Sequence, residues 1–263
     1  AWGHCTLQVV FVPGSPGTIE GGLQVDVTNA DRSNVYKPDP RRSTALQGES
    51  IMNLSRGTVA LQPGWNLLGN ASEARLPAQD LFGTPTRSIA GVSEHIRSVW
   101  QWSNKDSRWK FYSPQVGDDR GAYASAHGLL VLDAIAPREG YWVQTDAAVT
   151  FPLPAGVPLA FDSTAFASLP SGWHQLADAG RRNPRDFNSA LAATPPQPGM
   201  TPQNFQSLWA WDATQSRWFF YAPSLDARGG SAMADYIAGQ GLLDFSAAGR
   251  VLDSASGFWV LKP

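Results

Sequence analysis

The sequence predicts a mainly β protein that contains two copies of one fold. The main observation is a stretch that occurs twice without a gap, as S-[VL]-W-x-W-x4-S-R-W-x-F-Y-x-P, at residues 98–114 and 207–223. Glycine (25) and proline (20) are plentiful, whereas charged residues make up 16% of the 263 residues. An average soluble protein has roughly 25% charged residues. This composition favours strands and loops over helices.

Each copy of the stretch is typical of a β-hairpin of aromatic residues. In the first copy, Trp100 and Trp102 alternate with other residues, as do Trp109 and Phe111, with the period of two of a strand. The polar segment between them is rich in turn formers. If Trp102 lies opposite Trp109, then Trp100 lies opposite Phe111. The second copy predicts the equivalent pairs, which are Trp211 with Trp218 and Trp209 with Phe220.

Ten of the 11 tryptophans form matched pairs when the two copies are aligned. The pairs are Trp65 with Trp173, Trp100 with Trp209, Trp102 with Trp211, Trp109 with Trp218, and Trp142 with Trp259. We predict that these ten tryptophans form the structural core, because indole buries a large area and dominates packing. The alternative is that they lie exposed on a β face, where their rings stack on sugar rings.

The predicted fold class is mainly β, a β-rich α+β fold. Two homologous β domains with short helices follow each other, at residues 59–153 and 154–263, and an N-terminal β segment, residues 1–58, precedes them. One short helix is expected from Pro77 to a stop at Gly83. Another is expected to begin at Pro184, with Asn183 as its N-cap.

The N-terminal segment has too few apolar residues for a core of its own. We predict a strand in the uncharged run 6–12, and a second, half-buried strand where Leu23, Val25 and Val27 alternate with polar residues. A free apolar edge strand is a hazard, so the first strand is expected to add to the sheet of a neighbouring molecule or to pair within its own chain. The predicted subunit contact consists of Cys5, Thr6, Leu7, Val9, Val10, Phe11 and Val12. Cys5 either locks that contact as a disulfide or is a buried thiol.

The repeated motifs resemble a tandem tryptophan-rich repeat of secreted and surface proteins of Gram-negative bacteria. There the pattern reads roughly G-W-N-L-x-G, V-W-x-W, W-x-F-Y-x-P and G-x-G-F-W-V. In this chain it corresponds to residues 64–69, 99–102, 109–114 and 140–143, and to their equivalents in the second copy. The second copy departs at His174 and Gln175, which replace Asn and Leu. The resemblance implies export and surface display, and it implies no reaction.

Several classes of function are not expected. The net charge of −2, without a basic run, does not favour nucleic acid as a partner. No apolar run approaches the roughly 20 residues of a membrane helix. The four histidines have no ligand spacing, and no catalytic motif is present. We therefore expect no enzyme activity, no cofactor and no metal.

The sequence thus predicts a non-catalytic exported structural or adhesive protein, located outside the cell or on its surface, with its signal peptide already removed. It is expected to be a homo-oligomer or polymer, as a self-assembling subunit of a surface filament whose N-terminal strand mediates the contacts. The alternative function is a pair of carbohydrate-binding modules that hold polysaccharide with exposed tryptophans.

Overall fold

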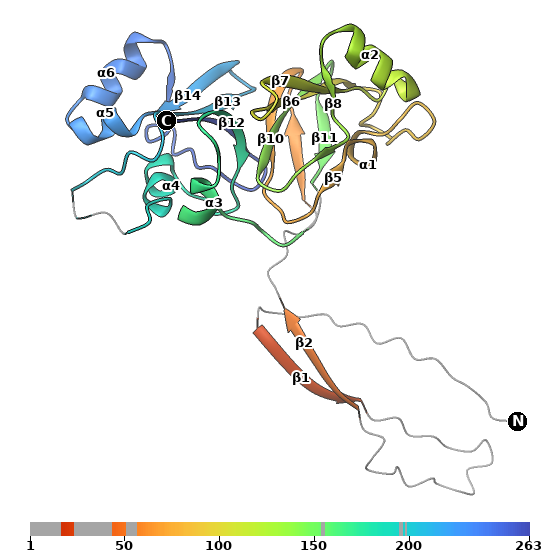
Figure 1. The fold of residues 1–263 in the computed structure, drawn as a ribbon, viewed down its shortest axis with the longest axis horizontal. Coiled ribbons are helices and arrows are strands. Elements are labelled where there is room, and N and C mark those ends of the chain that lie inside the picture. The colour runs from red at the N-terminus through yellow and green to blue at the C-terminus, as the bar shows by residue number, and fades with distance from the viewer. Residues whose placement is uncertain (1–16, 24–43, 51–56, 154–155, 195–196, 198) are drawn as a thin grey trace, which may run out of the picture. The chain divides into compact units, whose positions relative to one another are not determined.

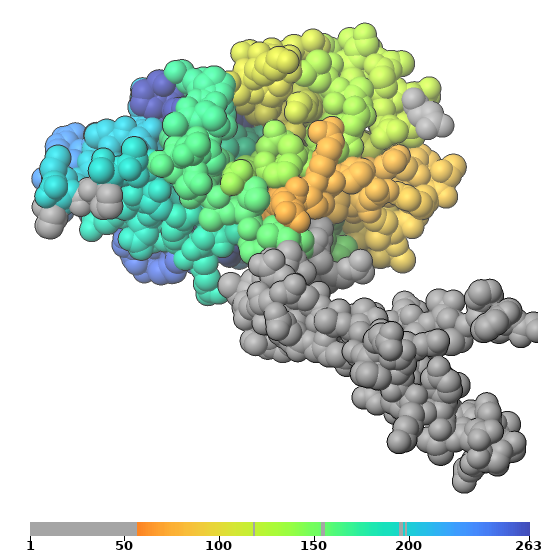
Figure 2. Space-filling model, turned by 60° about the horizontal axis from the view of Figure 1, so that its bottom comes forward, coloured from red at the N-terminus to blue at the C-terminus, as the bar shows by residue number. Residues whose placement is uncertain are grey.

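The structure is a computed structural model that describes residues 17–23, 44–50, 57–153, 156–194, 197 and 199–263. The chain divides into two compact units, residues 1–52 and 53–263. Both tryptophan-rich repeats belong to the second unit, so they form one body rather than two separate domains. Figure 2 shows them in contact, the first in orange to green and the second in teal to blue.

In the N-terminal unit, strand β1 (Gly17–Leu23) pairs with β2 (Thr44–Ser50) in an antiparallel ladder from Gly17 opposite Ser50 to Leu23 opposite Thr44. Of the half-buried strand predicted at Leu23, Val25 and Val27, only Leu23 is a described residue, and it is the last residue of β1; the rest of the predicted strand lies outside the described residues. Strand β2 was not predicted from the sequence. A ladder is made by backbone groups, so the alternation of apolar side chains does not report it.

The two repeats lie side by side (Figure 1) and have the same strand order, as the duplication predicts. The first repeat has the order β4 (Gly64–Asn70), β10 (Glu139–Thr145), β6 (Ile96–Ser103), β7 (Arg108–Tyr112) and β8 (Leu130–Val131). The second has the order β12 (Gly172–Ala177), β16 (Gly257–Lys262), β13 (Ser207–Asp212), β14 (Arg217–Tyr221) and β15 (Leu243–Asp244). In both repeats the last strand is parallel to its neighbour and the others are antiparallel.

The predicted hairpin registers are confirmed. Trp102 lies opposite Trp109 and Trp100 opposite Phe111. The equivalent pairs in the second hairpin are Trp211 with Trp218 and Trp209 with Phe220. The two turns also match in backbone conformation, because Ser107 and Ser216 have φ values of 48° and 51°. The local sequence therefore determines both strands and turn.

The repeats join through their opening and closing strands. Strand β10 pairs with β4 and, at Glu139 opposite Leu176, with β12. Strand β16 pairs with β12, and Ser256, the residue before β16, forms an isolated bridge with Leu68 of β4. These pairings and this bridge connect four strands, two from each repeat. Equivalent hydrogen bonds link the repeats in both directions, from Gly69 N to Ala255 O (3.0 Å) and from Ala177 N to Arg138 O (2.9 Å).

Glycine at the start of each closing strand permits this close junction. A Cβ atom on Gly257 would lie 2.1 Å from the carbonyl oxygen of Leu68, and one on Gly140 would lie 2.9 Å from that of Leu176. Leu68 and Leu176 are equivalent positions of the two repeats. The glycine of the G-[YF]-W-V motif is therefore required by contact with the other repeat.

Short helices and two-stranded sheets complete the second unit in its described residues. The first repeat carries α1 (Ala78–Phe82), the 3-10 turn Gly117–Asp119, α2 (Arg120–Ala126), and the pairs β3 (Thr58–Leu61) with β11 (Val149–Pro152) and β5 (Leu76–Pro77) with β9 (Ala134–Ile135). The second repeat carries α3 (Ser163–Ala167), α4 (Pro184–Ala190), α5 (Pro223–Arg228) and α6 (Ala232–Gly239). The predicted cap is confirmed, since the Asn183 side chain accepts from Asp186 N at 2.9 Å. Gly83, with φ 81°, ends α1 as predicted.

Each repeat has its own main hydrophobic core on one side of its sheet. Phe82, Tyr112, Tyr141 and Phe151 are among the most buried side chains of the first core. Phe187, Phe205, Leu208 and Phe258 have that role in the second. The core of each repeat is thus filled by phenylalanine, tyrosine and aliphatic side chains.

Candidate functional site

The ten repeat tryptophans lie on the face of the sheet that turns away from these cores. In β10, Tyr141 and Val143 are fully buried, and Trp142 between them points to the other side. In β6, Val99 and Gln101 are buried, whereas Trp100 and Trp102 are half-buried. Alternation along the strands thus gathers the tryptophans on one face.

The prediction that the ten tryptophans form the structural core is therefore wrong. None is fully buried, and Trp65 and Trp173 are 41% and 39% exposed. The corrected set comprises Trp65, Trp100, Trp102, Trp109, Trp142, Trp173, Trp209, Trp211, Trp218 and Trp259. The reason is that a period of two places the tryptophans on one face of the strand and does not tell which face is inside.

The indoles pack mainly edge to face, and several contacts cross between repeats. Within the hairpins, Trp102 and Trp109 have ring centroids 5.4 Å apart, and the equivalent Trp211 and Trp218 are 5.1 Å apart. Between repeats, Trp109 contacts Trp259 at 5.9 Å. The equivalent contact joins Trp218 to Trp142 at 5.6 Å. Edge-to-face pairs are a preferred arrangement of aromatic rings.

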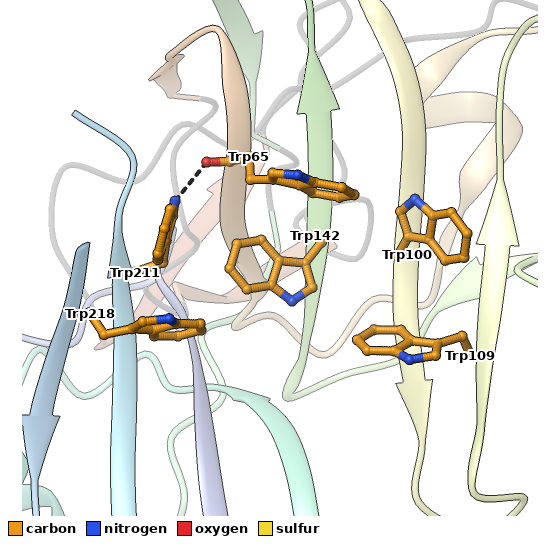
Figure 3. Close-up of a pocket in the computed structure, with 6 residues that line it drawn as sticks. All are labelled: Trp65, Trp100, Trp109, Trp142, Trp211 and Trp218. Carbon is orange, nitrogen blue, oxygen red and sulfur yellow. Dashed lines mark hydrogen bonds between the residues drawn. The ribbon is translucent and has the colours of Figure 1, made fainter. Parts of the chain in front are cut away.

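Two hollows open between these rings. The first, of about 470 Å³, is lined by Trp65, Trp100, Trp109, Trp142, Trp211 and Trp218. The second, of about 510 Å³, is lined by Trp102, Trp109, Trp142, Trp173, Trp209, Trp218 and Trp259. We call the two together the tryptophan groove. Figure 3 shows the first hollow, with Trp142 between Trp218 on one side and Trp109 on the other. Volumes of about 300–1,000 Å³ are typical of small-molecule sites.

The groove contains hydrogen-bond donors but no charge. Trp211 Nε1 donates to Trp65 O at 2.8 Å, and Trp209 Nε1 donates to Ser207 Oγ at 3.0 Å. The Trp100 Nε1 atom is sealed from solvent without a partner. Within the described part of the chain, the indole N–H groups of Trp109, Trp142 and Trp218 donate to no protein acceptor, and none of them is sealed from solvent without a partner as Trp100 Nε1 is.

Aromatic residues outside the tryptophan set continue the ring contacts beyond the groove. In the first repeat, Tyr123 of α2 stacks on Phe111 at 4.9 Å, and Phe111 contacts Trp100 at the same distance. In the second, Tyr236 of α6 lies 4.9 Å from Phe220. Sequence analysis did not assign the two tyrosines to the site. Their equivalent positions in the two repeats are the signal that indicates their role.

The described residues contain no group of three or more His, Cys, Asp or Glu that is placed to hold a metal ion. Asp226 of α5 pairs with Arg185 and accepts from the Tyr221 hydroxyl at 2.8 Å. His95 and Arg97 pair with Asp146 at the surface, and the hydrogen bond from His95 lowers the pKa of that carboxyl. No helix among the described residues is long and apolar enough to cross a membrane.

The predicted subunit contact, Cys5 to Val12, lies outside the described residues. Comparison with known proteins does not add an assignment. No family model matches the chain, and no curated protein and no solved structure matches it significantly.

Proposed function

We propose that this chain is a non-catalytic, exported adhesive protein that binds neutral polysaccharide through the tryptophan groove. The observation that carries the proposal is that ten tryptophans lie together on a partly exposed face, although the same chain fills its cores with other side chains. A monomeric protein rarely exposes a large contiguous apolar patch unless that patch binds something.

The chemistry of the groove supports a sugar as the ligand. The C–H face of a pyranose ring is apolar and suits the face of an indole. The indole N–H groups of Trp109, Trp142 and Trp218, which line both hollows, are donors suited to hydroxyl oxygens. An anionic ligand is disfavoured, because only tryptophans line the hollows and no cationic side chain there pairs with its charge.

Export is supported by the resemblance of the repeats to those of secreted and surface proteins. The resemblance implies no enzymatic reaction, which agrees with a binding role.

Intrinsic fluorescence during titration with soluble polysaccharides tests the proposal. A panel of xylan, dextran, hydroxyethyl cellulose and chito-oligosaccharides is expected to contain at least one ligand that gives a saturable change in tryptophan emission. The double variant Trp65→Ala/Trp173→Ala removes the two most exposed rings, one from each hollow. It is expected to lose at least about tenfold in affinity, because truncating an anchoring aromatic costs about 2 kcal/mol or more.

Met200→Ala is the matched control, since Met200 is 67% exposed and lines neither hollow. It is expected to bind as the wild type does. The glycan assignment fails if no neutral polysaccharide binds. A saturable response to choline chloride alone would identify the groove instead as an aromatic cage for a quaternary ammonium.

A further inference from the structure

We infer that the two hollows are one composite site, complete only when both repeats are present, and that a single polysaccharide chain occupies both. This inference rests on the proposed function and deepens it. It departs from the expectation of two carbohydrate-binding modules, in which each repeat would hold its own ligand.

Each hollow is built from both repeats. In the first, Trp65, Trp100, Trp109 and Trp142 come from repeat one, and Trp211 and Trp218 come from repeat two. In the second, Trp102, Trp109 and Trp142 come from repeat one, and the other four rings come from repeat two. A repeat by itself therefore lacks part of the wall of either hollow.

The hollows are equivalent under exchange of the repeats. Replacing each residue of the first hollow by its equivalent in the other repeat gives Trp173, Trp209, Trp218, Trp259, Trp102 and Trp109. All six line the second hollow, and the only addition there is Trp142. The local two-fold relation of the strands thus extends to the binding surface.

Hydrogen bonds hold the hairpin of each repeat against the opening strand of the other. Trp211 in β13 donates from Nε1 to Trp65 O in β4 at 2.8 Å. In the opposite direction, Asn104 follows β6 and donates from Nδ2 to Trp173 O in β12 at 3.2 Å. The Gln175 side chain of β12 also accepts from Trp102 N at 2.5 Å. These bonds fix the rings of one repeat beside those of the other.

The hollows also share walls. Trp109, Trp142 and Trp218 line both of them, and Trp142 contacts Trp218 at 5.6 Å. The hollows are therefore adjacent parts of one groove. A chain that fills one hollow continues past the shared rings toward the other, so contact with the second hollow becomes intramolecular and the affinity rises.

Isothermal titration with the cello- or chito-oligosaccharide series that binds tests this inference. From disaccharide to octasaccharide, the affinity is expected to rise by at least about tenfold and then level off. The stoichiometry of the longest member is expected to be one chain per protein. Two equal, independent sites with an affinity that does not depend on length would overturn the composite site and leave polysaccharide binding standing.

Two matched variants, one in each repeat, give a second readout. Trp211→Ala removes a ring that lines only the first hollow, and Trp102→Ala removes its equivalent from the second. Each is expected to lower the affinity for the octasaccharide by at least about tenfold. Each is also expected to reduce the gain in affinity with oligosaccharide length. Trp211→Phe and Trp102→Phe keep an aromatic ring and check that the loss does not come from misfolding.

The possible results separate the two proposals. If neither oligosaccharide series nor any polysaccharide binds, both the proposed function and the composite site fail. If Trp211→Ala and Trp102→Ala bind the octasaccharide as the wild type does while Trp65→Ala/Trp173→Ala does not, only the composite site fails.

Discussion

At the scale of single residues, the two repeats use different side chains to bond to the backbone just before their opening strands. Asn66 in β4 donates from Nδ2 to Gln62 O at 2.8 Å, four residues earlier. At the equivalent position in β12, His174 bonds through Nε2 to Pro170 O at 2.7 Å, also four residues earlier. The imidazole therefore takes the place of an amide, and it is buried there. This departure from the repeat motif has a structural reason and indicates no catalytic role.

His174 gives the second repeat a sensitivity to acid. Burial lowers the pKa of His174, the bond to Pro170 opposes this shift, and the nearby charge of Lys262 adds to it. As the pH falls below about 6.5, the ordinary pKa of histidine, the unfolded chain takes up a proton that the folded chain does not. The free energy of unfolding then decreases until the pH reaches the lowered pKa of the folded state.

The variant His174→Asn, which copies Asn66, is expected to remove this contribution. As the pH is lowered from about 7.5 to 5, the free energy of unfolding of the variant should increase relative to that of the wild type. Urea unfolding at each pH measures this difference. A difference that stays constant over that range contradicts the assignment.

Much of the local structure could be predicted from sequence, because short-range features determine it. The turn and the alternation of Trp100 and Trp102 set the hairpin register, and Asn183 marks a helix start. The face that is buried could not be predicted in this way. Strand β6 buries Gln101 and Ser103 and leaves its tryptophans half-exposed, against the usual preference for burying apolar side chains. That choice depends on helices and strands that lie far away in the sequence.

At the scale of elements, the junction between repeats rests on glycines at the start of β10 and β16. Gly257→Ala would place a Cβ against the backbone of Leu68, which is held in β4. Backbone cannot move aside as a flexible side chain does. We expect a loss of about 1–3 kcal/mol in the free energy of unfolding, as for overpacking of an interior, measured by urea unfolding.

Gly121→Ala is the matched control for this substitution. Gly121 lies in α2, and a Cβ atom there meets nothing within 4 Å. Alanine is expected to be neutral or to stabilise by up to about 1 kcal/mol, since it is the better helix former. Equal stability of Gly257→Ala and the wild type would show that β4 and β16 are not held as closely as the structure places them.

This junction also explains which part of the site sequence analysis missed. The repeat could be recognised because each copy preserves its own hairpin. The composite hollows arise from contacts such as Trp109 with Trp259, which lie in different repeats. A comparison of one copy with the other finds what the copies share and does not report how they touch.

At the scale of the whole molecule, the division into units bears on assembly. The predicted contact strand, residues 6–12, belongs to the unit of residues 1–52, and the tryptophan groove belongs to residues 53–263. The proposals of assembly and of glycan binding therefore concern different units of the chain and can be tested separately. We propose that the N-terminal strand adds to the sheet of a neighbouring molecule, because its run of β-branched and apolar residues carries no charge. A head-to-tail contact of this kind builds a filament unless its rotation closes a ring.

Deletion of residues 1–13 tests the proposal that the N-terminal strand mediates assembly. The truncated chain is expected to sediment as a folded monomer, whereas the full chain forms larger species at high concentration. Because both repeat cores lie in the other unit, the truncation should leave the thermal unfolding of the repeats and the binding of polysaccharide unchanged. Cys5→Ser in the full chain separates the two roles considered for the thiol, since loss of polymer only under oxidising conditions indicates a disulfide between chains. A truncated protein that still polymerises, or a full chain that stays monomeric at every concentration, removes the strand from the contact and leaves the tryptophan groove as the binding surface to test.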